Sequence, residues 1–217
     1  MFLRRPTPLR QSKSSFSIMS YNILAPIYVR PVDKRTGKIQ EFAAFRWVTK
    51  DDVLDVGKRE RKLRKQIQDS QADIVCLQEV QFVKNEEEKQ WELPLYLQMK
   101  DFGSVLPCDK DLDVMAKRNL RVLNKHAPVA NAILFRHDRF EMVSEISTRN
   151  QRVSATFRHL SAKGEKLFVR FFSFSLSSHE RERERSLRYT IYTKHRLLHS
   201  ILMLPIRTNA LPRCVSV

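Results

Sequence analysis

The segment that decides the fold is Ala72-Asp73-Ile74-Val75-Cys76-Leu77-Gln78-Glu79-Val80. Its short run of apolar and β-branched residues, bounded by polar ones, predicts a buried strand. Glu79 then lies at the carboxyl end of this strand, where ligands collect in open α/β sheets. A carboxylate held there suits Mg²⁺, which prefers oxygen ligands and keeps several waters. For a single glutamate, a solvated or ion-paired surface position remains the alternative.

A second strand is predicted upstream, in the stretch Phe16-Ser17-Ile18-Met19-Ser20-Tyr21-Asn22-Ile23-Leu24. Its residues alternate as in a half-buried strand. Pro26 follows and ends the strand, because proline has no N–H to donate to a neighbouring strand. Asn22 therefore lies near the end of this strand, as Glu79 does at the end of the other.

A helix is predicted between the two strands, over residues 58–70. This stretch is rich in helix formers, and Leu63 and Ile67 are four residues apart, on one face of the helix. A strand, a crossover helix and a second parallel strand place both strand ends at one edge of a sheet. Asn22 and Glu79 are therefore expected to share a site.

These motifs resemble the opening of the endonuclease/exonuclease/phosphatase superfamily. They are the segment Ser20-Tyr21-Asn22-Ile23-Leu24, the pair Arg61-Lys62 entering the helix, and the segment from Ala72 to Val80 that contains Leu77-Gln78-Glu79-Val80. Their order and spacing are most similar to the deadenylase branch, which includes the carbon catabolite repressor-type poly(A) nucleases, nocturnin and the Angel proteins. The resemblance continues through residues 129–136 and 140–143 and ends near Val169.

The resemblance implies an α/β fold, a two-sheet α/β sandwich that is incomplete in this chain. Residues 1–15 are expected to be a basic leader, residues 16–170 the N-terminal part of the domain, and residues 171–217 a low-complexity or non-homologous tail. The domain part is expected to hold one sheet and part of the second. A hairpin is predicted near its end, with strands at residues 156–160 and 166–169 joined through Gly164.

The resemblance also implies a Mg²⁺-dependent phosphodiesterase, a poly(A)-specific 3′–5′ exoribonuclease that acts on mRNA. Glu79 would bind the metal, and Asn22 would orient a ligand or a phosphate group. Arg61 and Lys62 would contact the nucleic acid. A phosphatase or phosphodiesterase that acts on another phosphate ester is the alternative within the superfamily.

The catalytic motifs of the family are only partly present. The family also needs an Asn-x-His on a later strand, an Asp-x-Asn and a terminal Asp-His pair, and none of these occurs after Val169. No aspartate follows Asp138. One carboxylate does not hold Mg²⁺ tightly. We therefore expect this chain to be truncated and inactive, with a non-catalytic, cationic RNA-binding fragment as the alternative from another class.

The composition of the tail differs from that of the domain. A run of Phe, Ser and Leu over residues 171–178 leads into a strict alternation of Glu and Arg over residues 180–185. Neither strand nor helix patterning requires such an alternation. Our hypothesis is that the reading frame enters retained intron or shifts near residues 169–172. A solvated helix with Glu–Arg pairs three and four residues apart is the alternative.

The charge of the chain favours polyanionic partners such as RNA. The formal net charge is +16 over 217 residues, with a pI of about 10.1. Part of the excess lies in the leader and the tail, outside the matched region. The basic residues of the predicted helix also suit an outer face exposed to water. The charge alone therefore does not establish RNA binding.

The sequence gives few signals of compartment. No apolar stretch approaches the roughly 20 residues of a membrane span, so no membrane partner is expected. A cytoplasmic or nuclear location is the simplest prediction. A mitochondrial one stays open because the first acidic residue is Asp33, although Pro6 and Pro8 interrupt any amphipathic helix in the leader.

Overall fold

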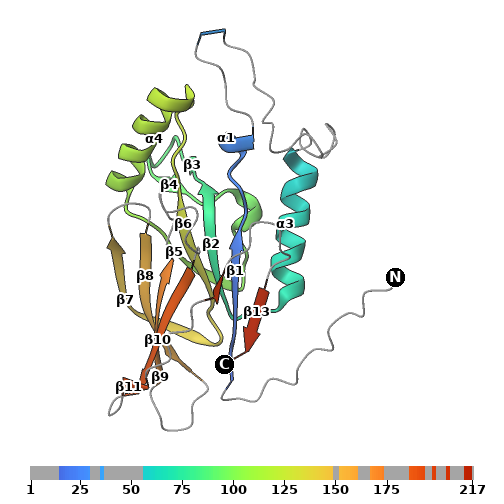
Figure 1. Cartoon of the computed structure of the whole chain (residues 1–217), viewed down its shortest axis with the longest axis vertical. Coiled ribbons are helices and arrows are strands. Elements are labelled where there is room, and N and C mark those ends of the chain that lie inside the picture. Colours follow the sequence, from blue (N-terminus) through green and yellow to red (C-terminus); the bar gives the residue numbers. More distant parts are fainter. Residues whose placement is uncertain are drawn as a thin grey trace.

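The computed structural model describes residues 15–29, 35–36, 56–148, 152–160, 167–173, 186–193, 197–198, 204–205 and 213–216. The expected basic leader lies outside these residues, except for Ser15. The Glu-Arg alternation of the tail also lies outside them. The strands of the described residues form two main sheets and a two-stranded hairpin (Figure 1).

The first sheet contains both strands predicted from the motifs. Its order is β13-β1-β2-β6-β5, with β13 at Arg213–Ser216, β1 at Ser17–Asn22, β2 at Ile74–Gln81, β6 at Val129–Arg136 and β5 at Phe102–Val105. β1 and β2 are parallel, and Asn22 lies opposite Gln78 in their register. The predicted common edge for the two strand ends is confirmed.

Helix α3 (Val56–Ser70) connects β1 to β2, in agreement with the predicted crossover helix. Leu63 and Ile67 are its buried residues, and their spacing of four places both on the face that meets the sheet. The helix ends where Gln71 adopts a left-handed backbone, with φ of 50°. The hydroxyl of Ser70 donates to the carbonyl of Ile67 at 2.6 Å and so satisfies one of the last carbonyls of the helix.

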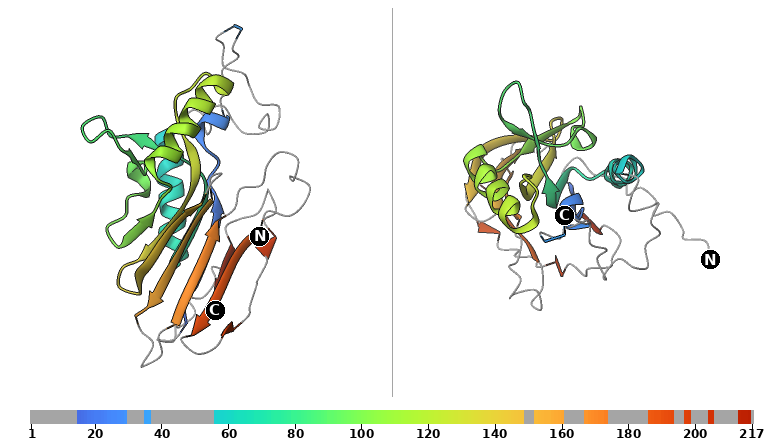
Figure 2. Two further views of the ribbon diagram at one scale, coloured as in Figure 1. Left: turned by 90° about the vertical axis from the view of Figure 1, so that its left-hand side faces the viewer. Right: turned by 90° about the horizontal axis from the view of Figure 1, so that it is seen from above.

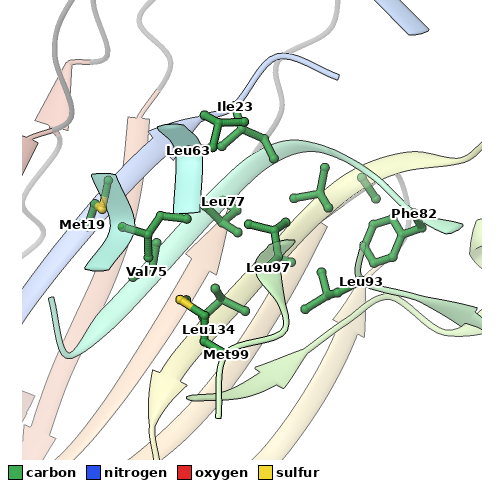
Figure 3. Packing of buried hydrophobic residues seen from close by; sticks show 14 of the residues in the cluster. Met19, Ile23, Leu63, Val75, Leu77, Phe82, Leu93, Leu97, Met99 and Leu134 are labelled. Atoms are coloured by element: carbon green, nitrogen blue, oxygen red, sulfur yellow. The ribbon is translucent and has the colours of Figure 1, made fainter. Parts of the chain in front are cut away.

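The outer face of the first sheet is covered by helices and by the segment after β2. That segment holds the hairpin of β3 (Val83–Lys84) and β4 (Trp91–Glu92) and the short 3₁₀ helix η2 (Leu95–Leu97). Helix α4 (Asp109–Leu123) buries Leu112 and Ala116 in the same core. Figure 3 shows ten labelled members of this core, among them Met19, Val75 and Leu77 from the strands. None of the helices within the described ranges is long and apolar enough to cross a membrane.

The second sheet is antiparallel throughout. Its order is β11-β10-β9-β8-β7, with β7 at Phe140–Thr148, β8 at Arg152–His159, β9 at Leu167–Ser173, β10 at Ser186–Thr193 and β11 at Leu197–Leu198, and β12 (Leu204–Pro205) pairs with β10. The predicted hairpin is confirmed by the pairing of β8 with β9. The two later segments of the resemblance, residues 129–136 and 140–143, form β6 and the start of β7, which belong to different sheets.

A second core lies between the two sheets. It joins Phe16, Ile18 and Ile133 of the first sheet region to Phe140 and Phe157 of the second. The rings of Phe16 and Phe140 meet edge to face, with centroids 5.5 Å apart, an arrangement that aromatic pairs prefer. The fold is thus a mixed α/β sandwich of two stacked sheets (Figure 2), which confirms the predicted fold class.

The part of the chain called the tail supplies strands to both sheets. β10 pairs with β9 in the second sheet, and β13 pairs with β1 in the first. Both pairings are antiparallel. The non-homologous origin of residues 171–217 stays a prediction, because backbone pairing does not report on the reading frame.

Candidate functional site

The two residues predicted to share a site are bonded to each other. The amide nitrogen Nδ2 of Asn22 donates to Oε1 of Glu79 at 2.8 Å. Oδ1 of Asn22 accepts a hydrogen bond from the backbone N–H of Leu24 at 2.9 Å, which fixes the orientation of the amide. The end of β1 therefore holds the Glu79 carboxylate in place.

Glu79 occupies a β-bulge in an uncommon backbone conformation. The register between β2 and β6 shifts between Leu77 and Val80, so Gln78 and Glu79 together lie opposite Asn131. The φ of Glu79 is 58°, in the left-handed region. For an L-residue this conformation costs about 1–2 kcal/mol. Non-glycine residues in such conformations cluster at functional sites, where the strain aims a side chain.

Two amide side chains adjoin this bulge on the face toward the second sheet. Gln78 is two residues from Cys76, and Asn131 is two residues from Ile133. Cys76 and Ile133 both belong to the core between the sheets. Because side chains alternate along a strand, Gln78 and Asn131 lie on that same face. They are 5% and 1% exposed, so both amides are buried.

These amides are not fully hydrogen bonded within the described parts of the chain. Nε2 of Gln78 donates to the carbonyl of Cys76 at 2.8 Å, but its Oε1 has no partner. Neither Nδ2 nor Oδ1 of Asn131 has one. A buried polar group without a hydrogen bond costs about 1–3 kcal/mol. Such a group in a native fold needs a bound water or ligand to explain it.

Arg59 stabilises the loop after β1 and was not predicted. Its guanidinium donates to the carbonyls of Ile23 and Leu24, the latter at 2.6 Å. Burial lowers the pKa of Arg59, and the nearby Tyr96 and Tyr21 oppose that shift. Burial also raises the pKa of Tyr96 to about 12 and raises the pKa of Tyr21, and the charge of Arg59 opposes both shifts. Arg59 lies four residues before Leu63, on the buried face of α3. This spacing is the feature of the sequence that could have predicted a buried position for Arg59.

The two residues expected to contact nucleic acid lie on the surface of α3. Arg61 and Lys62 are both exposed. Arg61 follows Arg59 by two residues and so lies on another side of α3, whereas Lys62 follows it by three and lies one turn along nearly the same side. Their contact with nucleic acid stays a prediction.

The sequence contains an Asn-x-His spacing at Asn124-Lys125-His126, but it is not on a strand. Asn124 is the cap of α4, with a left-handed φ of 54°, and its N–H donates to the carbonyl of Leu120 at 3.1 Å. The ring of His126 lies 5.8 Å from that of Trp91. These residues lie at and after the end of a helix, where the resemblance requires a strand.

The residues at this end of the sheet fit a loosely held, hydrated Mg²⁺. No group of three or more His, Cys, Asp or Glu side chains is placed to hold a metal within the described ranges. Mg²⁺ is commonly held by one or two carboxylates together with waters and substrate phosphates. Glu79 would supply one carboxylate to such an ion, and the unbonded oxygens of Gln78 and Asn131 would supply acceptors for its waters.

A surface pocket lies elsewhere, on the outer face of the first sheet. Its volume is about 440 Å³, and it is lined by Leu93, Leu97, Gln98, Met99, Lys100, Phe102, Ser104 and Leu134. Neither Asn22 nor Glu79 lines it. The pocket is therefore separate from the polar end of β1 and β2.

Comparison with known proteins gives structural neighbours and no sequence family. No family model matches the chain, and no curated protein matches it. Among solved structures, the chain is similar to ANGEL2, described as a 2′,3′-cyclic phosphatase, at 21% identity and a TM-score of 0.38. It is also similar to the human nocturnin catalytic domain with bound sulfate anion, at 16% identity and a TM-score of 0.43.

The similarity spans most of this chain but a smaller share of the two neighbours. It covers 73% of this chain and 36% of ANGEL2, and 79% of this chain and 54% of the nocturnin domain. Both neighbours are members of the superfamily branch that the motifs resemble. TM-scores of 0.38 and 0.43 are too low to infer a function from these neighbours. A function is therefore inferred from the geometry around Glu79.

Proposed function

We propose that Asn22 and Glu79 form the cation-binding end of a phosphodiesterase site for phosphate esters of RNA, with poly(A) 3′ ends as the substrate class. The observation that carries this proposal is the hydrogen bond of 2.8 Å between Asn22 and a glutamate in a left-handed bulge. A structural ion pair would not require that backbone. A carboxylate that must point at a ligand gives a reason for it.

The roles of the residues follow from their contacts. Glu79 would hold Mg²⁺, and the amide of Asn22 keeps the carboxylate in one orientation. Arg59 holds the loop after β1 against α3, and this limits movement of Asn22. When bound, the cation would supply positive charge to a phosphate oxygen and lower the pKa of a bound water.

The choice of RNA rests on charge and on the resemblance. The net charge of +16 favours a polyanion. Arg61 and Lys62 are exposed on the helix that precedes Glu79, which suits contact with a phosphate backbone. The same basic surface supports a second candidate, an RNA-binding fragment without catalysis. In that case RNA affinity would be independent of Glu79 and of Mg²⁺.

The proposal is tested by metal binding, because binding does not require a complete catalytic set. Mn²⁺ replaces Mg²⁺ as the probe, and free Mn²⁺ is followed by electron paramagnetic resonance during titration of the full chain. Wild type is expected to bind one Mn²⁺ weakly, and Glu79→Gln is expected to lose that binding. Glu86→Gln removes an exposed carboxylate from the β3–β4 hairpin and serves as the matched control. Equal binding by wild type and Glu79→Gln would contradict the proposal.

A further inference from the structure

Asn131 has no evident structural reason to be polar. The residues on either side of it in β6 are Ala130 and Ala132, and the next residue on its own face is Ile133. All of these are buried and apolar. An apolar side chain at position 131 would fit these surroundings without leaving an amide unpaired. The amide is therefore best explained by something that binds to it.

The unpaired atoms define what that partner must be. Two of them, Oε1 of Gln78 and Oδ1 of Asn131, are acceptors, and one, Nδ2 of Asn131, is a donor. Waters on a cation use a lone pair to bind the metal and turn their hydrogens outward, so they need acceptors. A phosphate oxygen needs a donor. A hydrated cation that is shared with a phosphate ester therefore complements all three atoms.

The position of these atoms agrees with that chemistry. Gln78 precedes Glu79 in the bulge, and Asn131 lies opposite the bulge in the register of β2 and β6. Gln78 is also the register partner of Asn22 in β1. The two unpaired amides thus adjoin the pair formed by Asn22 and Glu79.

We propose that Gln78 and Asn131 belong to the Glu79 site, and that their amide oxygens accept hydrogen bonds from waters bound to the cation. This inference rests on the function proposed above. Asn131 is then a positioning residue, since it acts on the cation through water. Removal of a group that is hydrogen bonded to a metal ligand or a metal-bound water typically lowers the metal affinity by about 10-fold or more.

The test repeats the Mn²⁺ titration on the full chain with Asn131→Leu, which removes both polar atoms at similar volume. Mn²⁺ affinity is expected to fall about 10-fold. Without metal, the unfolding midpoint is expected to stay equal to that of wild type or to rise, because the unpaired amide is gone. A merely structural asparagine would give the reverse: a lower midpoint and unchanged Mn²⁺ affinity.

Asn119→Leu is the matched control. Its amide on α4 is already bonded, with Nδ2 donating to the carbonyl of Ala127 at 2.7 Å. This variant is expected to lower the unfolding midpoint and leave Mn²⁺ affinity unchanged. Substitution of Asn131 should therefore lower Mn²⁺ affinity without lowering the unfolding midpoint, and substitution of Asn119 should lower the unfolding midpoint without changing Mn²⁺ affinity.

A second variant keeps the proposal testable if Asn131→Leu does not fold. Asn131→Asp retains an acceptor and adds a negative charge near the cation, so Mn²⁺ affinity is expected to rise roughly 10-fold. Unchanged Mn²⁺ affinity in folded Asn131→Leu or Asn131→Asp, with binding that still depends on Glu79, overturns this inference alone. Wild-type binding that does not depend on Glu79 overturns the proposed function, and this inference with it.

Discussion

The two ends of strand β2 both carry buried polar groups, but they differ in how these groups are paired. At the start, Asp73 accepts from the N–H of Ser17 at 2.7 Å and from its hydroxyl at 3.1 Å, and it forms an ion pair with Arg139. At the other end, Glu79 has a left-handed backbone, and unpaired amide atoms lie beside it. The first arrangement stabilises the fold. The second lowers its stability, which is expected where residues are kept for a ligand.

The paired end predicts the largest effect on stability. Asp73→Ala leaves Arg139 without its buried counter-charge and the N–H of Ser17 without an acceptor. The side chains of Asp73 and Arg139 are 3% and 18% exposed. We expect the free energy of unfolding to fall by about 3–5 kcal/mol, as for other buried pairs that lose one partner. Denaturation in urea measures it.

The matched control is the exposed ion pair between Arg136 and Asp138. Two hydrogen bonds of 2.9 and 2.8 Å join these residues, but Asp138 is 60% exposed. Asp138→Ala is expected to cost less than about 1 kcal/mol. Similar losses of unfolding free energy in Asp138→Ala and Asp73→Ala would show that the buried pair stabilises the fold no more than the exposed pair does.

At the Glu79 end of β2, a glycine substitution is expected to be more stable than an alanine substitution, which is the opposite of the usual order in a strand. Glu79→Gly and Glu79→Ala both remove the carboxylate, but only alanine must keep a left-handed backbone against its Cβ. Glu79→Gly is therefore expected to be more stable than Glu79→Ala by about 1–2 kcal/mol. Thermal and urea unfolding of the two variants measure the difference.

Gln81, two residues later in β2, gives the control because its φ is not positive. Its Oε1 accepts from the N–H of Ile27, and both variants lose that bond equally. Here alanine is expected to be more stable than glycine by about 0.5–1 kcal/mol. The same sign at both positions would show that the backbone of Glu79 is not strained.

The paired end also predicts a dependence on pH. Burial lowers the pKa of His159, and Arg139 lowers it further, whereas Asp73 acts in the opposite direction. The unfolded chain therefore takes up this proton first, near pH 6.5, and the folded state does so only at lower pH. Stability is expected to fall as the pH drops below about 6.5, and His159→Gln is expected to flatten that slope.

Melting temperatures between pH 5 and 7 measure this slope. His137→Gln, which removes a histidine from the surface, shows whether the slope belongs to His159 in particular. An unchanged slope in His159→Gln would contradict the role of this buried end in pH-dependent stability.

The smallest expected effect is on RNA hydrolysis. Within the described ranges, no group of three or more His, Cys, Asp or Glu side chains is placed to hold a metal, and the parts of an active site act together. This chain is expected to degrade a 3′-labelled oligo(A) no faster than Glu79→Ala does. A rate that depends on Glu79 would show that the chain holds a more complete site than Asn22 and Glu79 provide.

The sequence predicted the strands, the crossover helix and the meeting of Asn22 with Glu79, because hydrophobic periodicity and the parallel crossover determine them. It did not predict the bulge, since neither Gln78 nor Glu79 is a glycine that would indicate one. It did not predict the unpaired amide of Asn131 either. In the sequence, Asn131 is a single polar residue within an apolar strand. Whether its amide is hydrogen bonded depends on the residues opposite it in the neighbouring strand.

The most direct test of the difference between the two ends is the unfolding temperature as a function of Mg²⁺ concentration. A ligand that binds only the folded state stabilises it by about 2.7 kcal/mol at 100 times its Kd. We predict that Mg²⁺ raises the melting temperature of wild type and of Glu86→Gln, and leaves that of Glu79→Gln unchanged. An equal rise in Glu79→Gln, or no rise in wild type, would contradict the assignment of the Glu79 end to cation binding.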